Sequence, residues 1–140
     1  MKIFILLTIC ILFKNDYSHL PLQSQKSPIS LPIIFFDKNS SLLNDSAMHI
    51  LDSMSVILMN EEKIKIGVFG FANIDEENKE KLSLTRAENV FNYLIIKGLK
   101  SKNLEIYFYA DKIMLTDCRK WNCSETEKAR NRCVELIIID

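Results

Sequence analysis

The sequence is poor in glycine and proline and carries no excess of charge of either sign. Its 140 residues include only 3 Gly and 3 Pro, which argues against a collagen-like or linker-rich architecture. Basic and acidic side chains balance at 18 each, so the strongly cationic surface of a dedicated nucleic-acid-binding protein is missing. Hydrophobic residues make up 48% against 26% charged, which suffices for a packed core and excludes a largely disordered chain. The length favours a single domain.

The first apolar stretch, Ile3–Phe13, is too short to cross a membrane as a helix, which takes about 20 residues. It follows Lys2, and a basic start before a short apolar core is typical of a secretory signal peptide. We therefore predict a signal peptide over residues 1–18 and a polar, proline-punctuated linker over residues 19–30. A first buried strand or helix of the domain is the alternative. Lipidation at Cys10 is disfavoured, because a bulky residue precedes it and the apolar run continues past it.

From residue 31 to residue 140 the apolar spacing alternates between the periods of strands and helices. Strands are predicted at Leu31–Phe36, Lys63–Gly70, Leu104–Ala110 and Cys133–Ile139. Helices are predicted from Asn44 or Asp45 onward, from about Asn78 to Lys97 with Gly98 closing it, and as a short turn from Ser124. The order β-α-β-α-β-(α)-β favours an α+β sandwich, a mixed sheet covered by helices on one face.

Apolar side chains in both long helices recur at spacings of three and four, so each helix is predicted to bury one stripe. The first stripe comprises Met48, Ile50, Leu51, Met54, Ile57 and Leu58. The second comprises Leu82, Ala87, Val90, Phe91, Leu94 and Ile95. The first strand is an unbroken apolar run, which predicts a buried strand followed by a turn.

Three short segments carry information beyond the fold class. Residues 35–38 (Phe-Phe-Asp-Lys) end the first strand, residues 82–87 (Leu-Ser-Leu-Thr-Arg-Ala) open the second helix, and residues 131–135 (Asn-Arg-Cys-Val-Glu) lead into the last strand. In this order and spacing, residues 31–140 resemble the OmpA-like C-terminal domain, the peptidoglycan-binding module of bacterial cell envelopes. The family pattern L-S-x-x-R-A is complete here, whereas N-R-R-V-E has lost one arginine.

The resemblance implies a non-catalytic protein that binds the stem-peptide diamino acid of peptidoglycan, without cofactor, metal or catalytic residue. That ligand carries a carboxylate and an ammonium on one side chain, so a site for it needs an arginine and an acid. The ligand-binding residues implied by the resemblance are Asn73, Arg86, Asn131 and Arg132. The implied location is the periplasm, with envelope proteins as further partners, no nucleic acid, and any outer-membrane association through a partner. No transmembrane span is expected after signal removal.

The ligand loop departs from the family pattern. The family's G-H-T-D motif ends in Asn73 here, so an amide stands where the resemblance implies an acid. The interval from Asn73 to Arg86 is also two residues shorter than in the family. Asp75, Glu76 or Glu77 could restore the negative charge, or the three could form an acidic first helical turn.

Arg86 has a second interpretation, as a surface residue paired with Glu80 or Glu88, where such pairs contribute little. Taken with the altered loop, this leaves an alternative function open. The chain could be a degenerate OmpA-like module that serves protein–protein assembly in the envelope and does not bind peptidoglycan.

The loop around Cys118 and Cys123 is similar to that of Bacteroidetes-type OmpA-like proteins, in which a cysteine pair closes a small loop. Because an exported chain meets an oxidising compartment, we predict a Cys118–Cys123 disulfide. A redox or metal site is the alternative, but it lacks the C-x-x-C spacing and a histidine nearby in sequence. Cys133 is then expected to be a buried free thiol. A wall hydrolase or a thiol oxidoreductase would need a nucleophile with a nearby base, and we find no such pair in the sequence.

Overall fold

The computed structural model of the protein describes residues 31–61, 63–120 and 122–139. Along the chain the elements are β1 (Ile33–Phe35), α1 (Asp45–Leu58), β2 (Ile66–Phe71), α2 (Lys79–Ile96), a 3₁₀ turn (Ser101–Asn103), β3 (Leu104–Ala110), α3 (Glu125–Arg130) and β4 (Cys133–Ile138). The predicted order of strands and helices is confirmed. The predicted signal peptide (1–18) and linker (19–30) lie outside the described residues and stay predictions.

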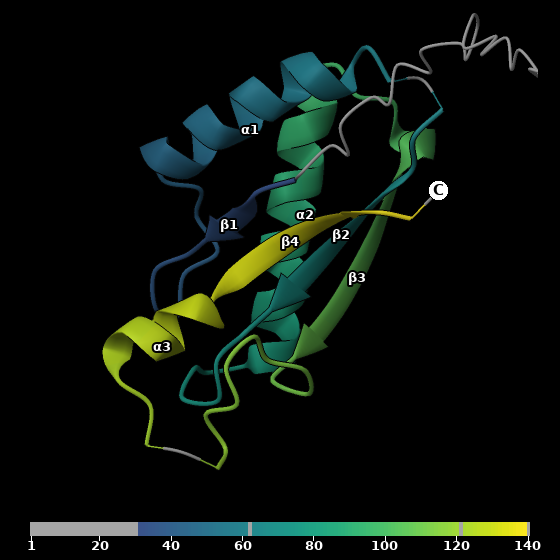
Figure 1. The fold of residues 1–140 in the computed structure, drawn as a ribbon. Helices are drawn as coiled ribbons and strands as arrows, with labels where there is room; N and C mark the ends of the chain where they lie inside the picture. Colours follow the sequence, from purple (N-terminus) through teal and green to yellow (C-terminus); the bar gives the residue numbers. More distant parts are fainter. Residues whose placement is uncertain (1–30, 62, 121, 140) are drawn as a thin grey trace, which may run out of the picture.

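The four strands form one mixed sheet in the order β1-β4-β2-β3. β2 and β3, which α2 connects, are parallel, whereas β4 runs antiparallel to both β1 and β2. Both long helices, α1 and α2, cover the same face of this sheet (Figure 1). The predicted α+β fold with a mixed sheet is therefore confirmed.

One hydrophobic core lies between the helices and the covered face of the sheet. Side chains alternate along each strand, so Val68 of β2 and Val134 of β4 both point toward the helices. They pack with Leu51 of α1 and Leu94 of α2, and all four are completely buried. Burial of side chains of this size contributes about 1.5–3 kcal/mol each, which makes this core the main stabilising feature.

Gly70 brings α2 directly against the sheet. A Cβ atom at this position would collide with the backbone carbonyl oxygen of Ser83 on α2. The Ser83 hydroxyl also accepts a hydrogen bond from the backbone N–H of Ala110, at 3.2 Å, and so links α2 to β3. This close contact holds the first turns of α2, and with them Arg86, against the end of β2.

Two predictions about burial are wrong. Among the described strands β1 pairs only with β4, and Phe35, which points to the sheet face away from the core, is 48% exposed. On α1, Ile57 is 53% exposed, and Ser55 is buried instead. The Ser55 hydroxyl donates to the Leu51 carbonyl at 2.7 Å, which satisfies this polar group and allows it to face the core.

The loop between β3 and α3 is closed by a disulfide between Cys118 and Cys123, whose Cα atoms are 5.5 Å apart. The predicted pairing is confirmed. Cys133 is a free thiol and is completely buried, as expected. None of the helices in the described ranges is long and apolar enough to cross a membrane.

Candidate functional site

The loop after β1, the loop after β2 and helix α3 gather at one end of the sheet (Figure 1). Arg86 reaches this region from α2, and its side chain is completely buried. Its Nε donates to the Ser40 carbonyl at 2.9 Å, Nη1 to the Phe71 carbonyl at 3.0 Å, and Nη2 to the Asp37 carbonyl at 3.1 Å. Its two remaining N–H groups bind Glu76, so all five donors of the guanidinium have partners within the chain.

Glu76 is the carboxylate partner of Arg86 and is itself buried, with 4% exposure for the residue and none for the side chain. The contact is bidentate, with Arg86 Nη2 at 2.6 Å from Oε1 and Nη1 at 2.9 Å from Oε2. Oε1 also accepts from the backbone N–H of Asn39 at 2.8 Å, and Oε2 accepts from that of Asn73 at 2.9 Å. Four hydrogen bonds match the acceptor capacity of a carboxylate, so the charge is fully compensated.

Further contacts tie the loop after β1 to the loop after β2. The Lys38 ammonium lies 2.9 Å from Asp75 Oδ2, and the backbone N–H of Glu77 donates to the Asn39 side chain at 3.0 Å. Asn39 has a φ of +54°, a left-handed conformation that asparagine tolerates better than most residues. The two loops therefore close over the Glu76–Arg86 pair.

Asn73 and Asn131 are both completely buried and hydrogen-bonded to each other, with Asn131 Nδ2 donating to Asn73 Oδ1 at 2.8 Å. Asn131 also exchanges two hydrogen bonds with the backbone of Thr116, both at 2.8 Å, and so anchors the disulfide loop. Asn73 Nδ2 donates to Asp75 Oδ1 at 2.6 Å. A carboxylate therefore lies directly beside the amide that replaces the family's acid.

The Asp75 carboxylate lies in a small group of charges. The Lys38 ammonium is the main cause that holds the pKa of Asp75 below its usual value. The Lys128 ammonium of α3 lies 3.9 Å from the same carboxylate. Because cations surround it, Asp75 stays ionised at neutral pH.

Arg132 is the remaining arginine of the site, and it differs from Arg86 in its hydrogen bonding. It is only 9% exposed, and its Nε and Nη1 atoms are buried with no hydrogen-bond partner in the described ranges. The backbone N–H of Phe36 donates to the Arg132 carbonyl at 2.8 Å, which fixes Arg132 beside the end of β1. Glu125 raises the pKa of Lys128, and the Arg132 charge partly opposes this rise. Arg132 and Lys128 are therefore close enough to repel each other.

A buried N–H group without a partner destabilises the fold by about 1–3 kcal/mol. A hydrogen-bond acceptor placed beside the Arg132 guanidinium would therefore be stabilising. Of the four residues that the resemblance implies for ligand binding, Asn73, Arg86 and Asn131 are satisfied by the chain itself. Among these four, only Arg132 has buried donor atoms, Nε and Nη1, without a partner in the described ranges. The structure thus brings the four residues into one region. They differ in that three have their side-chain hydrogen bonds within the chain, whereas these two atoms of Arg132 have none among the described residues.

The interpretation of Arg86 as a surface residue paired with Glu80 or Glu88 is wrong, because its partners are Glu76 and three backbone carbonyls. Of the three acids that the sequence offered to restore a negative charge, Glu76 turns inward to Arg86, and none lies in the first turn of α2, which begins at Lys79. The shortened interval between Asn73 and Arg86 was the available signal, since a shorter loop brings its own acids closer to the arginine.

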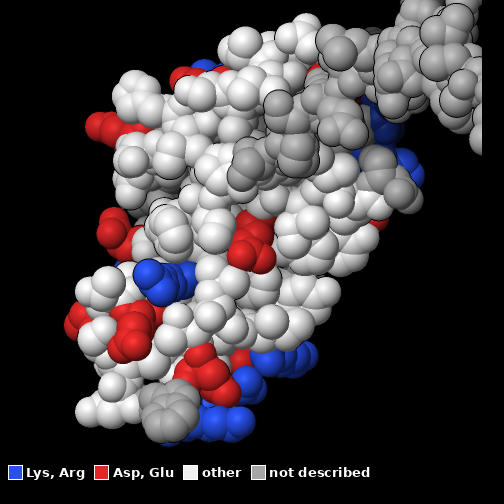
Figure 2. All heavy atoms as spheres, viewed as in Figure 1, with Lys and Arg blue, Asp and Glu red and all other residues white. Residues whose placement is uncertain are grey.

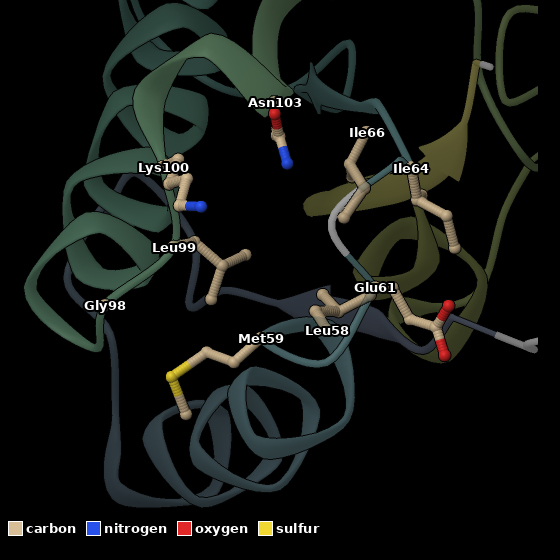
Figure 3. A pocket seen from close by; sticks show the side chains of 9 residues that line it. All are labelled: Leu58, Met59, Glu61, Ile64, Ile66, Gly98, Leu99, Lys100 and Asn103. Carbon is tan, nitrogen blue, oxygen red and sulfur yellow. The ribbon is translucent and has the colours of Figure 1, made fainter.

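Other features of the described chain do not form a second site of this kind. A cavity of about 40 Å³ lies where the ends of α1 and α2 meet the start of β2, with Leu58, Ile66 and Leu99 among its lining residues (Figure 3). Small-molecule pockets are typically 300–1,000 Å³, so this cavity has room for only a few water molecules. The face in Figure 2 shows acidic side chains interspersed with basic ones rather than an extended basic surface.

The described residues contain no group of three or more His, Cys, Asp or Glu side chains that could hold a metal ion. Burial, with a smaller contribution from the Glu135 charge, raises the pKa of the Cys133 thiol far above its usual value. A thiol is nucleophilic only as the thiolate, so Cys133 is a packing residue.

A mixed sheet in the order β1-β4-β2-β3 carries both long helices on one face, and a buried arginine of α2 lies at the ends of β1 and β2. Together these features define an OmpA-like α+β domain. Residues 35–132 match the model of the OmpA family, so the chain belongs to the OmpA family.

Solved structures with the same fold include the C-terminal domain of Helicobacter pylori MotB, with 20% identity, a TM-score of 0.71, and coverage of 79% of this chain and 86% of that chain. The peptidoglycan-associated lipoprotein from Burkholderia pseudomallei has 22% identity, a TM-score of 0.70, and coverage of 84% and 98%. The OmpA-like domain of FopA1 from Francisella tularensis has 20% identity, a TM-score of 0.63, and coverage of 74% and 68%. No curated protein matches the chain.

Proposed function

We propose that this domain is a non-catalytic module of the bacterial cell envelope that binds peptidoglycan non-covalently through a carboxylate of the stem peptide. The observation that carries the proposal is the Arg132 guanidinium, whose Nε and Nη1 atoms are buried without a hydrogen-bond partner among the described residues. A carboxylate satisfies such a pair of donors better than a neutral acceptor does. Membership of the OmpA family supports the proposal, and one relative of the same fold is named a peptidoglycan-associated lipoprotein.

The proposed ligand is the diamino acid of the stem peptide, which carries a carboxylate and an ammonium close together. Arg132 would bind the carboxylate, with Lys128 adding positive charge nearby. Asp75 would receive the ammonium in place of one of its lysine contacts, which are with Lys38 at 2.9 Å and Lys128 at 3.9 Å. Asn73 and Asn131 would hold this arrangement in position rather than donate to the ligand, because their side-chain groups already bond within the chain.

The same proposal places the protein in the periplasm, with any association with the outer membrane made through a partner protein. The signal peptide over residues 1–18 and the resemblance of the disulfide loop to Bacteroidetes-type proteins stay predictions.

Co-sedimentation with purified peptidoglycan sacculi tests the proposal. The wild-type chain should sediment with sacculi, and Arg132→Ala should weaken binding at least about tenfold, since it removes the donors to a buried ligand charge. Arg130→Ala is the matched control, because Arg130 lies two residues away and is exposed, and it should bind as the wild type does. Thermal melting of each variant separates loss of binding from loss of folding.

One observation favours the alternative, a degenerate module that serves protein–protein assembly. Arg86, which the family resemblance places at the ligand, is completely buried and saturated by its own chain. If the folded wild-type chain does not sediment with sacculi at any concentration tested, peptidoglycan binding is wrong and the assembly module stands.

A further inference from the structure

We propose that Glu76 is a tethered internal ligand, whose carboxylate occupies a carboxylate-binding site formed by the Arg86 guanidinium and the backbone N–H groups of Asn39 and Asn73. The consequence for the wall, that an external carboxylate reaches Arg86 only by displacing Glu76, rests on the proposed function.

The donors that converge on this carboxylate come from separate parts of the chain. Arg86 belongs to α2, Asn39 to the loop after β1, and Asn73 to the loop after β2. The guanidinium presents two parallel N–H groups, at 2.6 and 2.9 Å, and each backbone N–H completes one carboxylate oxygen, at 2.8 and 2.9 Å. A bidentate arginine with convergent backbone N–H groups is a general arrangement for binding a carboxylate.

The rest of the guanidinium is held independently of Glu76. Backbone carbonyls of Asp37, Ser40 and Phe71 accept its other three N–H groups, and the Phe36 ring centroid lies 5.3 Å from its Cζ. Removal of the Glu76 carboxylate therefore leaves the arginine oriented toward the space that the carboxylate filled.

The tether explains why this site is closed in the wild-type chain. A turn with a hydrogen bond from Glu76 N–H to the Asn73 carbonyl, at 3.1 Å, holds the carboxylate within reach of Arg86. Even a flexible tether supplies a local concentration on the order of millimolar, so free carboxylates below that concentration do not compete. Arg132, whose Nε and Nη1 have no partner in the part of the chain that the structure describes, is then the arginine left to bind a ligand carboxylate in the wild type.

A hollow of about 330 Å³ lies at the surface of this region. Its lining residues include Asn39, as well as Glu77 and Thr85, which are next to Glu76 and Arg86 in the sequence. Neither Glu76 nor Arg86 lines this hollow, so acetate rescue requires that shortening the Glu76 side chain opens a path from the hollow to Arg86.

Chemical rescue tests this inference in the full chain. Glu76→Ala should lower the melting temperature, and acetate should restore it in a saturable manner that chloride at equal ionic strength does not reproduce. With acetate at about ten times its dissociation constant, mass action predicts a rise of about 5 °C for a domain of this size. Glu77→Ala is the matched control, because Glu77 is exposed, and its melting temperature should respond to acetate and chloride alike.

Glu76→Gln provides a second test. It fills the same space with an uncharged amide, so it should melt below the wild type and show no specific response to acetate. If Glu76→Ala does not fold in chloride, recovery of its circular-dichroism signal in acetate alone supports the inference, and failure to recover in either salt overturns it. Equal responses of Glu76→Ala to acetate and chloride also overturn it.

The acetate experiment involves no peptidoglycan, so its outcome is separate from that of the wall-binding proposal. Sacculus binding with no acetate rescue refutes the internal ligand alone. Acetate rescue without sacculus binding by the wild type refutes wall binding alone.

Discussion

Arg86 and Glu76 are both shielded from water by the loops after β1 and β2, so each charge depends on the other. Removing two charges from water is costly, and a buried ion pair is stable only when its geometry is good and its other polar groups are satisfied. Here every donor of Arg86 and every carboxylate oxygen of Glu76 has a partner. The pair therefore joins the loop after β2 and α2 to the loop after β1, which is distant in sequence.

Arg86→Ala should reduce the free energy of unfolding by about 3–5 kcal/mol, because it leaves the Glu76 carboxylate buried without its counter-charge. Arg86→Lys should recover little, since an ammonium cannot supply the planar pair of N–H groups. Urea denaturation measures both, with exposed Arg130→Ala as the control at less than about 0.5 kcal/mol. A loss below about 1 kcal/mol for Arg86→Ala would contradict this account of the pair.

Asp75 should contribute to the free energy of unfolding at neutral pH, and this contribution should be lost in acid. The Lys38 ammonium holds the Asp75 pKa below the usual 3.8, so folding favours the ionised form. The contribution is therefore complete above about pH 4 and disappears as the pH falls through the folded-state pKa. Asp75→Asn should melt below the wild type at pH 7, and the difference should shrink below pH 4. A difference that grows on acidification would be inconsistent with this role.

At the scale of helices and strands, local sequence patterns predict most elements of this chain. β3 occupies the predicted residues Leu104–Ala110, because its run of apolar and aromatic side chains between turn-forming residues has few alternatives. The pattern is less informative for β1, where an apolar run cannot distinguish a central strand from an edge strand. That distinction depends on β4, which arrives about a hundred residues later in the chain.

The candidate site was predictable only in part, for a similar reason. The motif around Arg86 and the end of β2 indicate that Arg86 and Asn73 lie close together, and both bind the same Glu76 oxygen. The choice of Glu76 rather than its acidic neighbours depends on the position of Asn39, which is 37 residues away in sequence. No local pattern encodes a contact of that range.

The disulfide should stabilise the loop between β3 and α3. A double variant, Cys118→Ala with Cys123→Ala, should lose about 2–3 kcal/mol of unfolding free energy, on a chain-entropy model for a short closed loop. Intact-mass measurement after alkylation without reduction should show neither of these cysteines modified in the native wild type. Alkylation of both in native protein would rule the bond out.

The close packing of α2 on β2 should make Gly70 sensitive to substitution. Gly70→Ala places a methyl group against the backbone carbonyl of Ser83, which cannot move without shifting α2, so a loss of about 1–3 kcal/mol or more is expected. At Gly67 the nearest atoms belong to the Phe69 ring, and Gly67→Ala should cost less because a side chain can adjust. Urea denaturation of the two variants compares them, and equal losses would contradict the proposed rigidity at Ser83.

At the scale of the whole molecule, the OmpA fold supports the loops, and the altered ligand loop determines how the two arginines are hydrogen-bonded. The sheet and the two long helices form a rigid support, and the loops at one end hold two arginines in different states. Arg86 is paired with the Glu76 carboxylate, whereas Nε and Nη1 of Arg132 have no partner among the described residues. We propose that Arg132, rather than Arg86, recognises the carboxylate of the wall.

An NMR titration of the arginine Nε–H signals tests this claim most directly. A peptidoglycan stem peptide with a free diamino acid is added to the ¹⁵N-labelled wild type, with signals assigned from Arg86→Lys and Arg132→Lys variants. We predict that the Arg132 signal shifts in a saturable manner while the Arg86 signal stays in place. A shift of Arg86 with Arg132 unchanged, or no shift of either at millimolar ligand, would contradict the account.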